Sequence, residues 1–258
     1  MKIHLYGLGL LAASFCLSVS AADLSRSTVE QRLAKADKSH PAQLRRKDLR
    51  NVDLSGLDFK NADLWGSDLR SANLSNSDLS GLNLDLTVMT KINLSGANLS
   101  NASIFGVHMV GANLSKANLT GSRFIANLDR ANLSNADLSH ANWGVDMKNQ
   151  PMGLMRVTLN NADLSGANLS DANLNRALLR HANLTKSVLK NTVLYGADLS
   201  GADLTDADLS GADLSESKLE DADFTGANLA GTRFGSIKDK SVLKGLISSK
   251  NLEAAIFN

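Results

Sequence analysis

Hydrophobic residues recur every five positions through most of this chain of 258 residues. Typical units are ANLSN, SDLSG, ANLTG and ADLTD, and we call the leucine the centre of each unit. Centres keep one five-residue spacing from Leu44 to Phe124, a second from Leu128 to Trp143, and a third from about Leu159 to Phe234. A small residue usually stands two positions before the centre, and polar residues fill the remaining positions.

A period of five matches neither an α-helix, at 3.6 residues per turn, nor a flat strand, at 2. One unit cannot be stable alone. Ordering five residues costs roughly 5–10 kcal/mol of backbone entropy, whereas burying one Leu and one Ala returns about 2–4 kcal/mol. Stacking of successive units must supply the difference, which predicts a solenoid.

The pattern A(N/D)LXX resembles the pentapeptide-repeat family, and the resemblance extends over residues 42–236. It implies an all-β solenoid, a right-handed quadrilateral β-helix with four units per coil and about nine coils. In that fold the centre and the small residue point inward, and the other three residues face solvent. At the usual strand spacing the rod would be about 45 Å long.

Some units depart from the pattern. Leu57, Leu82, Ile92 and Val107 stand where a small residue is usual, which predicts locally wider early coils. Lys47 occupies the same position, and an unpaired charge cannot be buried there cheaply. The first coil is therefore expected to be open at its end, or to begin near Val52.

Two interruptions break the five-residue spacing. One residue is missing between Phe124 and Leu128, which we expect a tightened corner to absorb. Between Trp143 and Leu159 the stretch GVDMKNQPMGLMRVT loses the motif. Because Pro151 cannot donate to a strand ladder, a projecting loop is predicted over about 144–157.

Both ends of a solenoid expose backbone groups and need covering. Ser27 to Glu30 resembles a capping box, so a short amphipathic helix is predicted from about Thr28 to Lys38, within a capping segment 22–41. The tail 237–258 is too apolar for a free tail. It is expected to form a short helical cap over the last coil, or to pair with a second molecule. The family resemblance implies that such a homodimer forms through the C-terminal end.

The first 21 residues have the pattern of a signal peptide. A basic start is followed by an apolar run over 5–19 and by small residues, with cleavage expected after Ala21. The run is short for a membrane span, so no span is expected after cleavage, although an uncleaved anchor is an alternative. A lipoprotein at Cys16 is disfavoured by the large Phe15 before it. The mature protein would be periplasmic or secreted, without cysteine.

Charge says little about partners. Removal of Lys2 reduces the 27 basic residues by one, which leaves a formally neutral mature chain against 26 acidic residues. This gives no reason to expect nucleic-acid binding. Basic residues gather early, at Arg45, Arg46, Lys47 and Arg50. Acidic ones gather late, at Asp203, Asp206, Asp208, Asp213, Glu216, Glu220, Asp221 and Asp223, which suggests a rod with opposite charges at its two ends.

The sequence predicts no catalytic, cofactor-binding or metal site. A filled rod offers no obvious cleft for catalysis, and the histidines have no ligand spacing. Three methionines of the loop, Met147, Met152 and Met155, allow the alternative of a copper site. No His or Cys lies within the loop, however, and Met also fills gaps flexibly.

Large apolar residues stand at some outward positions where the repeat usually has polar ones, and we take them, with the methionines of the loop, as the candidate partner site. Trp65 and Phe105 should lie on one face two coils apart, with Asp85 between them. The full candidate set is Trp65, Phe105, Leu178, Val188, Val193, Tyr195, Met147, Met152 and Met155. The predicted function is an exported, non-enzymatic scaffold that binds an unidentified protein. The alternative, a DNA-mimicking regulator of a topoisomerase, follows from family members that protect DNA gyrase, but the export signal and neutral charge disfavour it.

Overall fold

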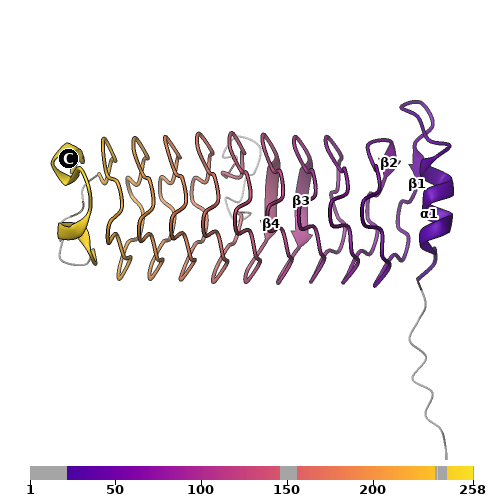
Figure 1. Cartoon of the computed structure of the whole chain (residues 1–258), viewed down its shortest axis with the longest axis horizontal. Helices are drawn as coiled ribbons and strands as arrows, with labels where there is room; N and C mark the ends of the chain where they lie inside the picture. Colours follow the sequence, from indigo (N-terminus) through magenta and orange to yellow (C-terminus); the bar gives the residue numbers. More distant parts are fainter. Residues whose placement is uncertain (1–21, 146–155, 236, 238–242, 258) are drawn as a thin grey trace, which may run out of the picture.

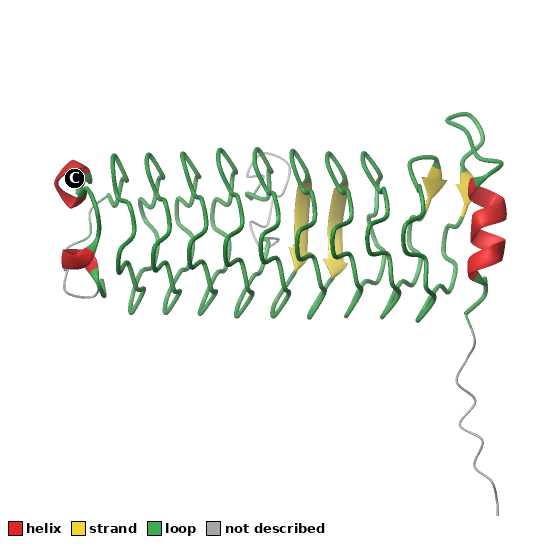
Figure 2. Cartoon of the chain, viewed as in Figure 1, coloured by secondary structure: helices red, strands yellow, loops and turns green. Residues whose placement is uncertain are grey.

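The computed structural model describes residues 22–145, 156–235, 237 and 243–257. In this part of the chain, successive turns stack into one rod, with a helix at the N-terminal end and two short 3-10 helices at the C-terminal end (Figures 1 and 2). Most of the chain between them is loop-like backbone held by parallel bridges of single residues. The prediction of a four-sided β-helix with short helical ends is confirmed.

The register of the bridges follows from the five-residue unit. Four units make a turn of twenty residues, so Asn73 pairs with Asn93 and Asn93 with Asn113. The centre Leu74 donates its N–H to the carbonyl of Asn93 at 2.7 Å, and the N–H of Asn93 donates to Ala72 at 2.9 Å. We number the four faces by the centres of the second turn: Leu64 on face 1, Leu69 on face 2, Leu74 on face 3 and Leu79 on face 4.

The structure contains four short strands in two parallel pairs. Strand β1 (Ala42–Gln43) pairs with β2 (Ala62–Asp63), and β3 (Ser103–His108) pairs with β4 (Arg123–Asn127). Both pairs include residues of face 1. The pairing of β3 with β4 carries an irregularity between Phe105 and Val107, where Gly106 has no partner in β4.

The core consists of the centres and of the small residues two positions before them. On face 1 it is a single column of fully or almost fully buried side chains: Leu44, Leu64, Leu84, Ile104, Phe124, Trp143, Leu174, Leu194, Leu214 and Phe234. The column has ten members, one for each turn, compared with the prediction of about nine coils. At the small-residue position, Leu82, Ile92 and Val107 are buried as expected, whereas Leu57 remains half-buried beside the N-terminal helix.

The corners need backbone in the left-handed region. The residue two positions after most centres has a positive φ, and it is usually Gly or Asn, which tolerate that conformation. Side chains at this position lie against the corner of the next turn. A Cβ added to Gly96 would meet Oδ1 of Asn76 at 2.5 Å. Glycine in one turn therefore makes room for the asparagine of the turn before it.

The structure excludes one of the two alternatives for the first coil and contradicts the expectation for the short unit before Leu128, whereas a repeat that begins at residue 42 agrees with it. The solenoid does not begin near Val52, because β1 at Ala42 already pairs with β2 and both Leu44 and Leu49 are fully buried. Lys47 stays half-buried in this first turn. The missing residue before Leu128 does not tighten a corner. The unit between Phe124 and Leu128 has only four residues and lacks the corner residue with a positive φ. Strand β4 therefore passes through this corner as extended backbone.

The N-terminal helix α1 (Arg26–Leu33) is shorter than predicted and begins earlier. Ser25 caps it by accepting the N–H of Thr28, and Glu30 bonds Arg26 rather than closing a capping box at Ser27. The helix packs Val29 onto the core.

Guanidinium groups of α1 also cover the open edge of the first turn. Arg26 donates to the carbonyls of Asp53 and Ser55 at 3.2 and 3.0 Å, and Arg32 donates to the carbonyl of Gln43 at 2.5 Å. These carbonyls belong to the first turn, so no preceding turn can donate to them.

The C-terminal segment adds a last, irregular turn. Lys244, Lys250 and Ile256 pair with Asp223, Asn228 and Arg233 of the turn before it. The 3-10 helices η2 (Leu246–Ser248) and η3 (Leu252–Ala254) form parts of this turn. Leu243 and Leu246 are buried while Ile247 is 96% exposed. The segment therefore ends the rod by continuing its ladder.

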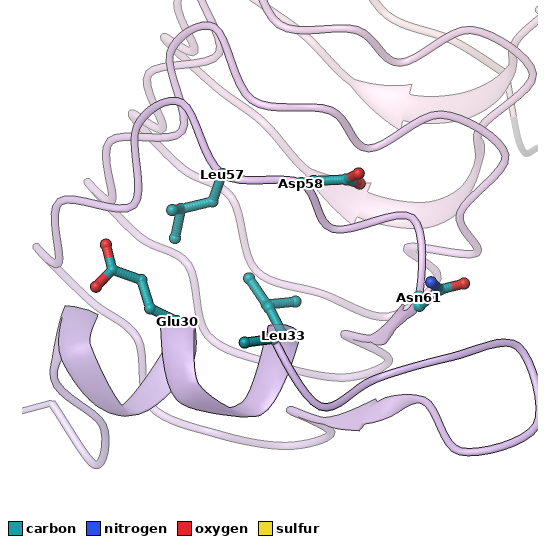
Figure 3. A pocket seen from close by; sticks show the side chains of 6 residues that line it. Glu30, Leu33, Leu57, Asp58 and Asn61 are labelled. Carbon is teal, nitrogen blue, oxygen red and sulfur yellow. The ribbon is translucent and has the colours of Figure 1, made fainter.

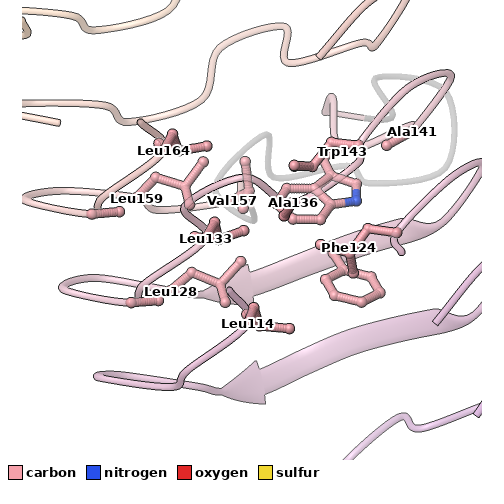
Figure 4. Close-up of a cluster of buried hydrophobic side chains, with 14 of the residues drawn as sticks. Leu114, Phe124, Leu128, Leu133, Ala136, Ala141, Trp143, Val157, Leu159 and Leu164 are labelled. Atoms are coloured by element: carbon pink, nitrogen blue, oxygen red, sulfur yellow. The ribbon is translucent and has the colours of Figure 1, made fainter. Parts of the chain in front are cut away.

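The insertion after Trp143 changes the register without breaking the ladder. Bridges that join residues 19 or 20 apart become 31 apart, as in Asn127 with Thr158 and Asn142 with Asn173. Trp143 itself is fully buried, and Figure 4 shows it beside Phe124 within the core. Most of the predicted projecting loop, including Pro151, lies outside the described residues.

Candidate interaction surface

The structure separates the predicted surface residues onto three faces. Trp65, Phe105, Val193 and Tyr195 lie on face 1, because the bridges and hydrogen bonds of their turns connect into one column. Leu178 pairs with Thr158 and Asp198 on face 2, and Val188 pairs with Asn168 and Asp208 on face 4. The methionines of the loop lie outside the described residues. Face 1 therefore carries two separate pairs, Trp65 with Phe105 and, four turns further on, Val193 with Tyr195. Leu178 and Val188 are isolated on other faces.

Trp65, Asp85 and Phe105 occupy the same position in three consecutive turns, one residue after the centre. The carbonyl of Trp65 accepts from Arg46, that of Asp85 from Gly66, and that of Phe105 from Leu86. Both aromatic side chains are half-buried. The prediction that Trp65 and Phe105 share a face with Asp85 between them is therefore confirmed.

Leu86 completes this group and was missed by the sequence reasoning. Its side chain is 52% exposed, and its φ of 60° lies in the left-handed region. Because branched Leu is disfavoured there by about 1–2 kcal/mol, the repeat itself gives no reason for it. Gly66 and Gly106 take this corner in the adjoining turns. A Leu at a corner position that Gly or polar residues otherwise occupy was the available signal. We call Trp65, Leu86 and Phe105 the apolar strip.

The N-terminal edge of the apolar strip is basic. The guanidinium carbons of Arg45 and Arg46 lie 4.7 and 5.0 Å from the centroid of the Trp65 ring. Arg45 also approaches Asp63, with Nε 3.4 Å from Oδ2. Cation–π contacts at exposed sites contribute about 0.5–1 kcal/mol each. Trp65 is thus held in place by cations from the preceding turn.

Oδ1 of Asp85 is one of three buried side-chain oxygens without a hydrogen-bond partner among the described residues; the others are Oγ1 of Thr158 and Oδ1 of Asn175. Asp129 takes the equivalent position on face 2, and there Oδ1 accepts from the backbone and the side-chain amide of Asn160 at 2.9 and 3.1 Å. The rod can therefore satisfy an aspartate at this position, but it does not do so at Asp85.

Some charges elsewhere on the rod are paired within it. Arg50 donates to both oxygens of Asp48, at 2.9 and 2.5 Å, and these bonds lower the pKa of Asp48 to about 2. Burial raises the pKa of Asp198, but hydrogen bonds from Arg180 and Ser200 outweigh it and the net pKa is lowered.

The acidic residues of the C-terminal turns are distributed over several faces of the rod. Asp203 and Asp223 lie on face 3, Asp208 on face 4 and Asp213 on face 1. Lys190 pairs with Asp208, and Lys244 of the last turn pairs with Asp221. The acidity therefore surrounds the rod and is partly neutralised.

Other site types find little support in the described residues. They contain no group of three or more His, Cys, Asp or Glu side chains that could hold a metal ion. None of the helices among them is both long and apolar enough to cross a membrane. Two small pockets flank α1. One, of about 250 Å³, lies where Leu33 and Leu57 point into the gap between helix and first turn (Figure 3). The other, of about 260 Å³, includes Arg32 and His40.

Comparison with family models assigns the chain. The model of pentapeptide repeats matches eight copies, at residues 48–85, 83–121, 126–143, 154–191, 172–211 and 207–236. These matches cover more than half of the chain, so the chain belongs to the pentapeptide-repeat family. Its fold is the right-handed quadrilateral β-helix, and proteins of this family are in general non-enzymatic scaffolds. A comparison with curated protein sequences finds no match.

Solved structures of the family are similar to this chain. HetL of the cyanobacterium Nostoc sp. strain PCC 7120, a protein involved in heterocyst differentiation regulation, is 28% identical, with 90% of this chain and 94% of HetL covered and a TM-score of 0.40. Full-length QnrB1, a plasmid-mediated fluoroquinolone resistance protein, is 21% identical, with coverage of 77% and 93% and a TM-score of 0.33. Rfr23 of the cyanobacterium Cyanothece 51142 is 20% identical, with coverage of 70% and 91% and a TM-score of 0.19.

Proposed function

We propose that this chain is an exported, non-enzymatic pentapeptide-repeat scaffold that binds a protein partner through the apolar strip on face 1. The observation that supports the proposal is the strip itself. Three large apolar side chains lie together over consecutive turns of a surface that is otherwise mostly Ser, Asn, Asp and Gly. Aromatic side chains of this kind are enriched among the residues that dominate protein–protein binding.

The repeat does not need these residues. The ladder requires a centre, a small residue and a corner residue that tolerates positive φ, and Ser or Asn is sufficient elsewhere. Leu86 shares its positive φ with many polar residues at other corners, but it is the only apolar residue among those of the described chain. An apolar side chain that is 52% exposed is accounted for if a partner buries it.

Export is the second part of the proposal, and it rests on the signal-peptide pattern of residues 1–21. Cell fractionation with intact-mass measurement tests it directly. We expect a mature protein that begins at Ala22, outside the cytosol. A cytosolic protein that retains residues 1–21 would contradict export. The homodimer through the C-terminal segment stays a prediction that size-exclusion chromatography can check.

The binding surface is tested by photo-crosslinking in the producing cell, with a photoreactive amino acid in place of Leu86. We expect a discrete crosslinked partner, identified by mass spectrometry, whose yield falls at least tenfold when Trp65→Ser and Phe105→Ser are added. The matched control is Val88→Ser with Val110→Ser, since these half-buried valines face outward on face 2. Equal yields from the strip variant and from the wild type would rule out the strip as the binding surface.

A further inference from the structure

The outward aromatic residues of the solenoid gather in one column of face 1. Within the described solenoid, residues 42–145 and 156–235, three aromatic side chains stand at outward positions: Trp65, Phe105 and Tyr195. Each follows a centre of face 1 by one residue, and the bridges join these turns into one column. Among the same residues, the other three faces carry no outward aromatic side chain. One side of a four-sided rod is therefore distinguished from the rest.

The two ends of this column, at Trp65 and Tyr195, repeat one local arrangement. An arginine occupies the corner of the preceding turn, Arg46 in the first case and Arg176 in the second. Its N–H donates to the carbonyl of the aromatic residue, at 3.0 Å for Trp65 and 2.9 Å for Tyr195. Its side chain lies against the glycine after the aromatic residue, where an added Cβ would meet Cγ of Arg46 at 3.4 Å and Cγ of Arg176 at 3.3 Å. We call Arg46 with Trp65 the first anchor and Arg176 with Tyr195 the second anchor.

The guanidinium groups of both anchors are free to meet a partner. Arg46 and Arg176 are exposed, and neither forms an ion pair within the described residues. Arg180, on the next face, is by contrast bonded to Asp198 at 2.6 Å. A guanidinium group binds a carboxylate through two parallel hydrogen bonds. Each anchor therefore offers a site for a carboxylate beside an aromatic surface.

Both anchors also point the same way along the rod. An acidic residue stands in the turn after each ring, Asp85 after Trp65 and Glu216 after Tyr195; the carbonyl of Asp85 accepts from the corner glycine of its anchor, and Glu216 follows the residue that does so at the second anchor. Each anchor is thus positive toward the N-terminal end and negative toward the C-terminal end. One partner can meet both in the same orientation.

The two anchors are too far apart to act on one another. Trp65 and Tyr195 are separated by six turns of the column, or about 29 Å at the spacing of neighbouring strands. Exposed charges at this distance are screened in physiological salt, where the Debye length is about 8 Å. A stable protein interface buries about 800 Å² on each partner, which a single anchor does not provide. A partner that lies along face 1 contacts both.

We propose that face 1 binds one elongated protein partner at both anchors, and that this partner presents to each anchor an acidic residue beside an apolar one. The inference rests on the proposed function, extends the binding surface to Tyr195 and specifies the partner's chemistry. Val193, which is 37% exposed, lies beside Tyr195 as Leu86 lies beside Trp65. A basic residue at either arginine would bring like charges together, which is unfavourable.

Photo-crosslinking in the producing cell tests whether one partner spans both anchors. Photoreactive benzoylphenylalanine replaces Tyr195 in one strain and Leu86 in another. We expect both positions to crosslink to the same protein, identified by mass spectrometry. Because the anchors do not touch each other, a change at one should lower the crosslink at the other only through the partner. Arg46→Gln with Trp65→Ser should lower the yield at position 195 at least threefold.

The matched control is Arg130→Gln. Arg130 is an exposed corner arginine with a positive φ of 59°, but it follows face 2. Its replacement should leave the crosslinks at positions 86 and 195 unchanged. Thermal unfolding checks that all variants remain folded, and outward substitutions of this kind should change stability by less than about 0.5 kcal/mol.

A second measurement identifies the group that each arginine meets. Arg46→Lys and Arg176→Lys keep the positive charge and introduce an amine, which a carbodiimide couples to a carboxylate in direct contact. We expect an amide bond between position 46 or 176 and an Asp or Glu of the photo-crosslinked protein. Arg130→Lys should give no such product. Photo-crosslinks without amide bonds at either position would overturn the acidic chemistry.

Two other results would overturn the inference of a spanning partner: different proteins at positions 86 and 195, or a yield at position 195 that ignores the change at the first anchor. If position 86 crosslinks a protein in a manner that depends on Trp65 and Phe105 while position 195 gives no product, the proposed function stands and only this inference fails. If neither position crosslinks, the proposed function fails as well.

Discussion

The indole of Trp143 stacks on the phenyl ring of Phe124 inside the rod, with 4.8 Å between the ring centroids and 5° between the ring planes. This distance equals the spacing of neighbouring strands, so two flat side chains in one column meet face to face without any adjustment of the backbone. Phe234 and Phe257 repeat the arrangement at the C-terminal end, at 4.7 Å and 3°. Aromatic residues are therefore tolerated at centres where they follow one another in a column.

The buried indole is satisfied by Ser122, whose Oγ accepts Nε1–H of Trp143 at 3.0 Å. Ser122→Ala leaves this donor unpaired in the core, so the free energy of unfolding should fall by about 1–3 kcal/mol. Urea unfolding followed by circular dichroism measures it. Ser134→Ala, at an outward position, is the control and should change stability by less than about 0.5 kcal/mol. Equal effects of the two would mean that the indole finds another acceptor.

The inward and outward positions of one unit should differ sharply in tolerance to charge. Leu164 is fully buried, while Ser165 is outward and only partly covered. Leu164→Lys introduces an unpaired charge into a closed ladder and should cost several kcal/mol. Ser165→Lys should cost less than about 0.5 kcal/mol. Melting temperatures of the two variants decide this, and similar shifts would contradict the orientation of the unit.

Replacing a corner glycine by alanine should destabilise the rod by an amount that depends on the side chain lying against that glycine. A Cβ added to Gly201 would meet Nδ1 of His181 at 2.3 Å, whereas one added to Gly81 meets nothing within 4 Å. Both glycines have a positive φ, so substitution by alanine has the same backbone conformational cost at each position. Gly201→Ala should therefore destabilise by about 0.5–1 kcal/mol more than Gly81→Ala. In a His181→Ala background this difference should vanish, and its persistence would assign it to the backbone instead.

The hydrogen bonds by which Arg26 caps the open edge of the first turn can be tested separately from the packing of α1. Arg26→Met keeps an apolar side chain of similar length but removes the donors to the carbonyls of Asp53 and Ser55. We expect a loss of about 1–2 kcal/mol in unfolding free energy. Hydrogen exchange should show faster exchange confined to the first turn. Lys35→Met, on an exposed side chain, is the control, and exchange as slow as in the wild type would contradict the cap.

Low pH should destabilise the first turns, because protonation of Asp48 removes its ion pair with Arg50. Its pKa in the folded rod, about 2, lies below the ordinary value of about 3.9. The pairing with Arg50 therefore stabilises the rod above pH 4, and this contribution is lost as the pH falls through 2. NMR titration should show the pKa of Asp48 rising toward its ordinary value in Arg50→Met. Melting temperatures of this variant should fall less steeply than those of the wild type between pH 5 and pH 2.

Much of the fold was predictable because the repeat is strictly local. The inward direction of each Leu, the twenty-residue turn and the shared face of Trp65 and Phe105 follow from counting in fives. The departures were less predictable. Whether Lys47 ends the solenoid depended on α1 and on the second turn, and the extended corner before Leu128 depended on pairing with β3. Both involve contacts between segments that no single unit encodes.

The sequence by itself determined the ladder, since hydrogen bonds and buried leucines repeat with the same period as the residues that make them. Only the tertiary structure decided how the ladder ends and which outward side chains become neighbours. It joined the C-terminal tail to the rod as a last turn, placed Leu178 and Val188 on faces away from Tyr195, and left Asp85 between two rings without a donor. The reason is physical: neighbours along a column are about twenty residues apart, and insertions such as the one after Trp143 shift which residues become neighbours.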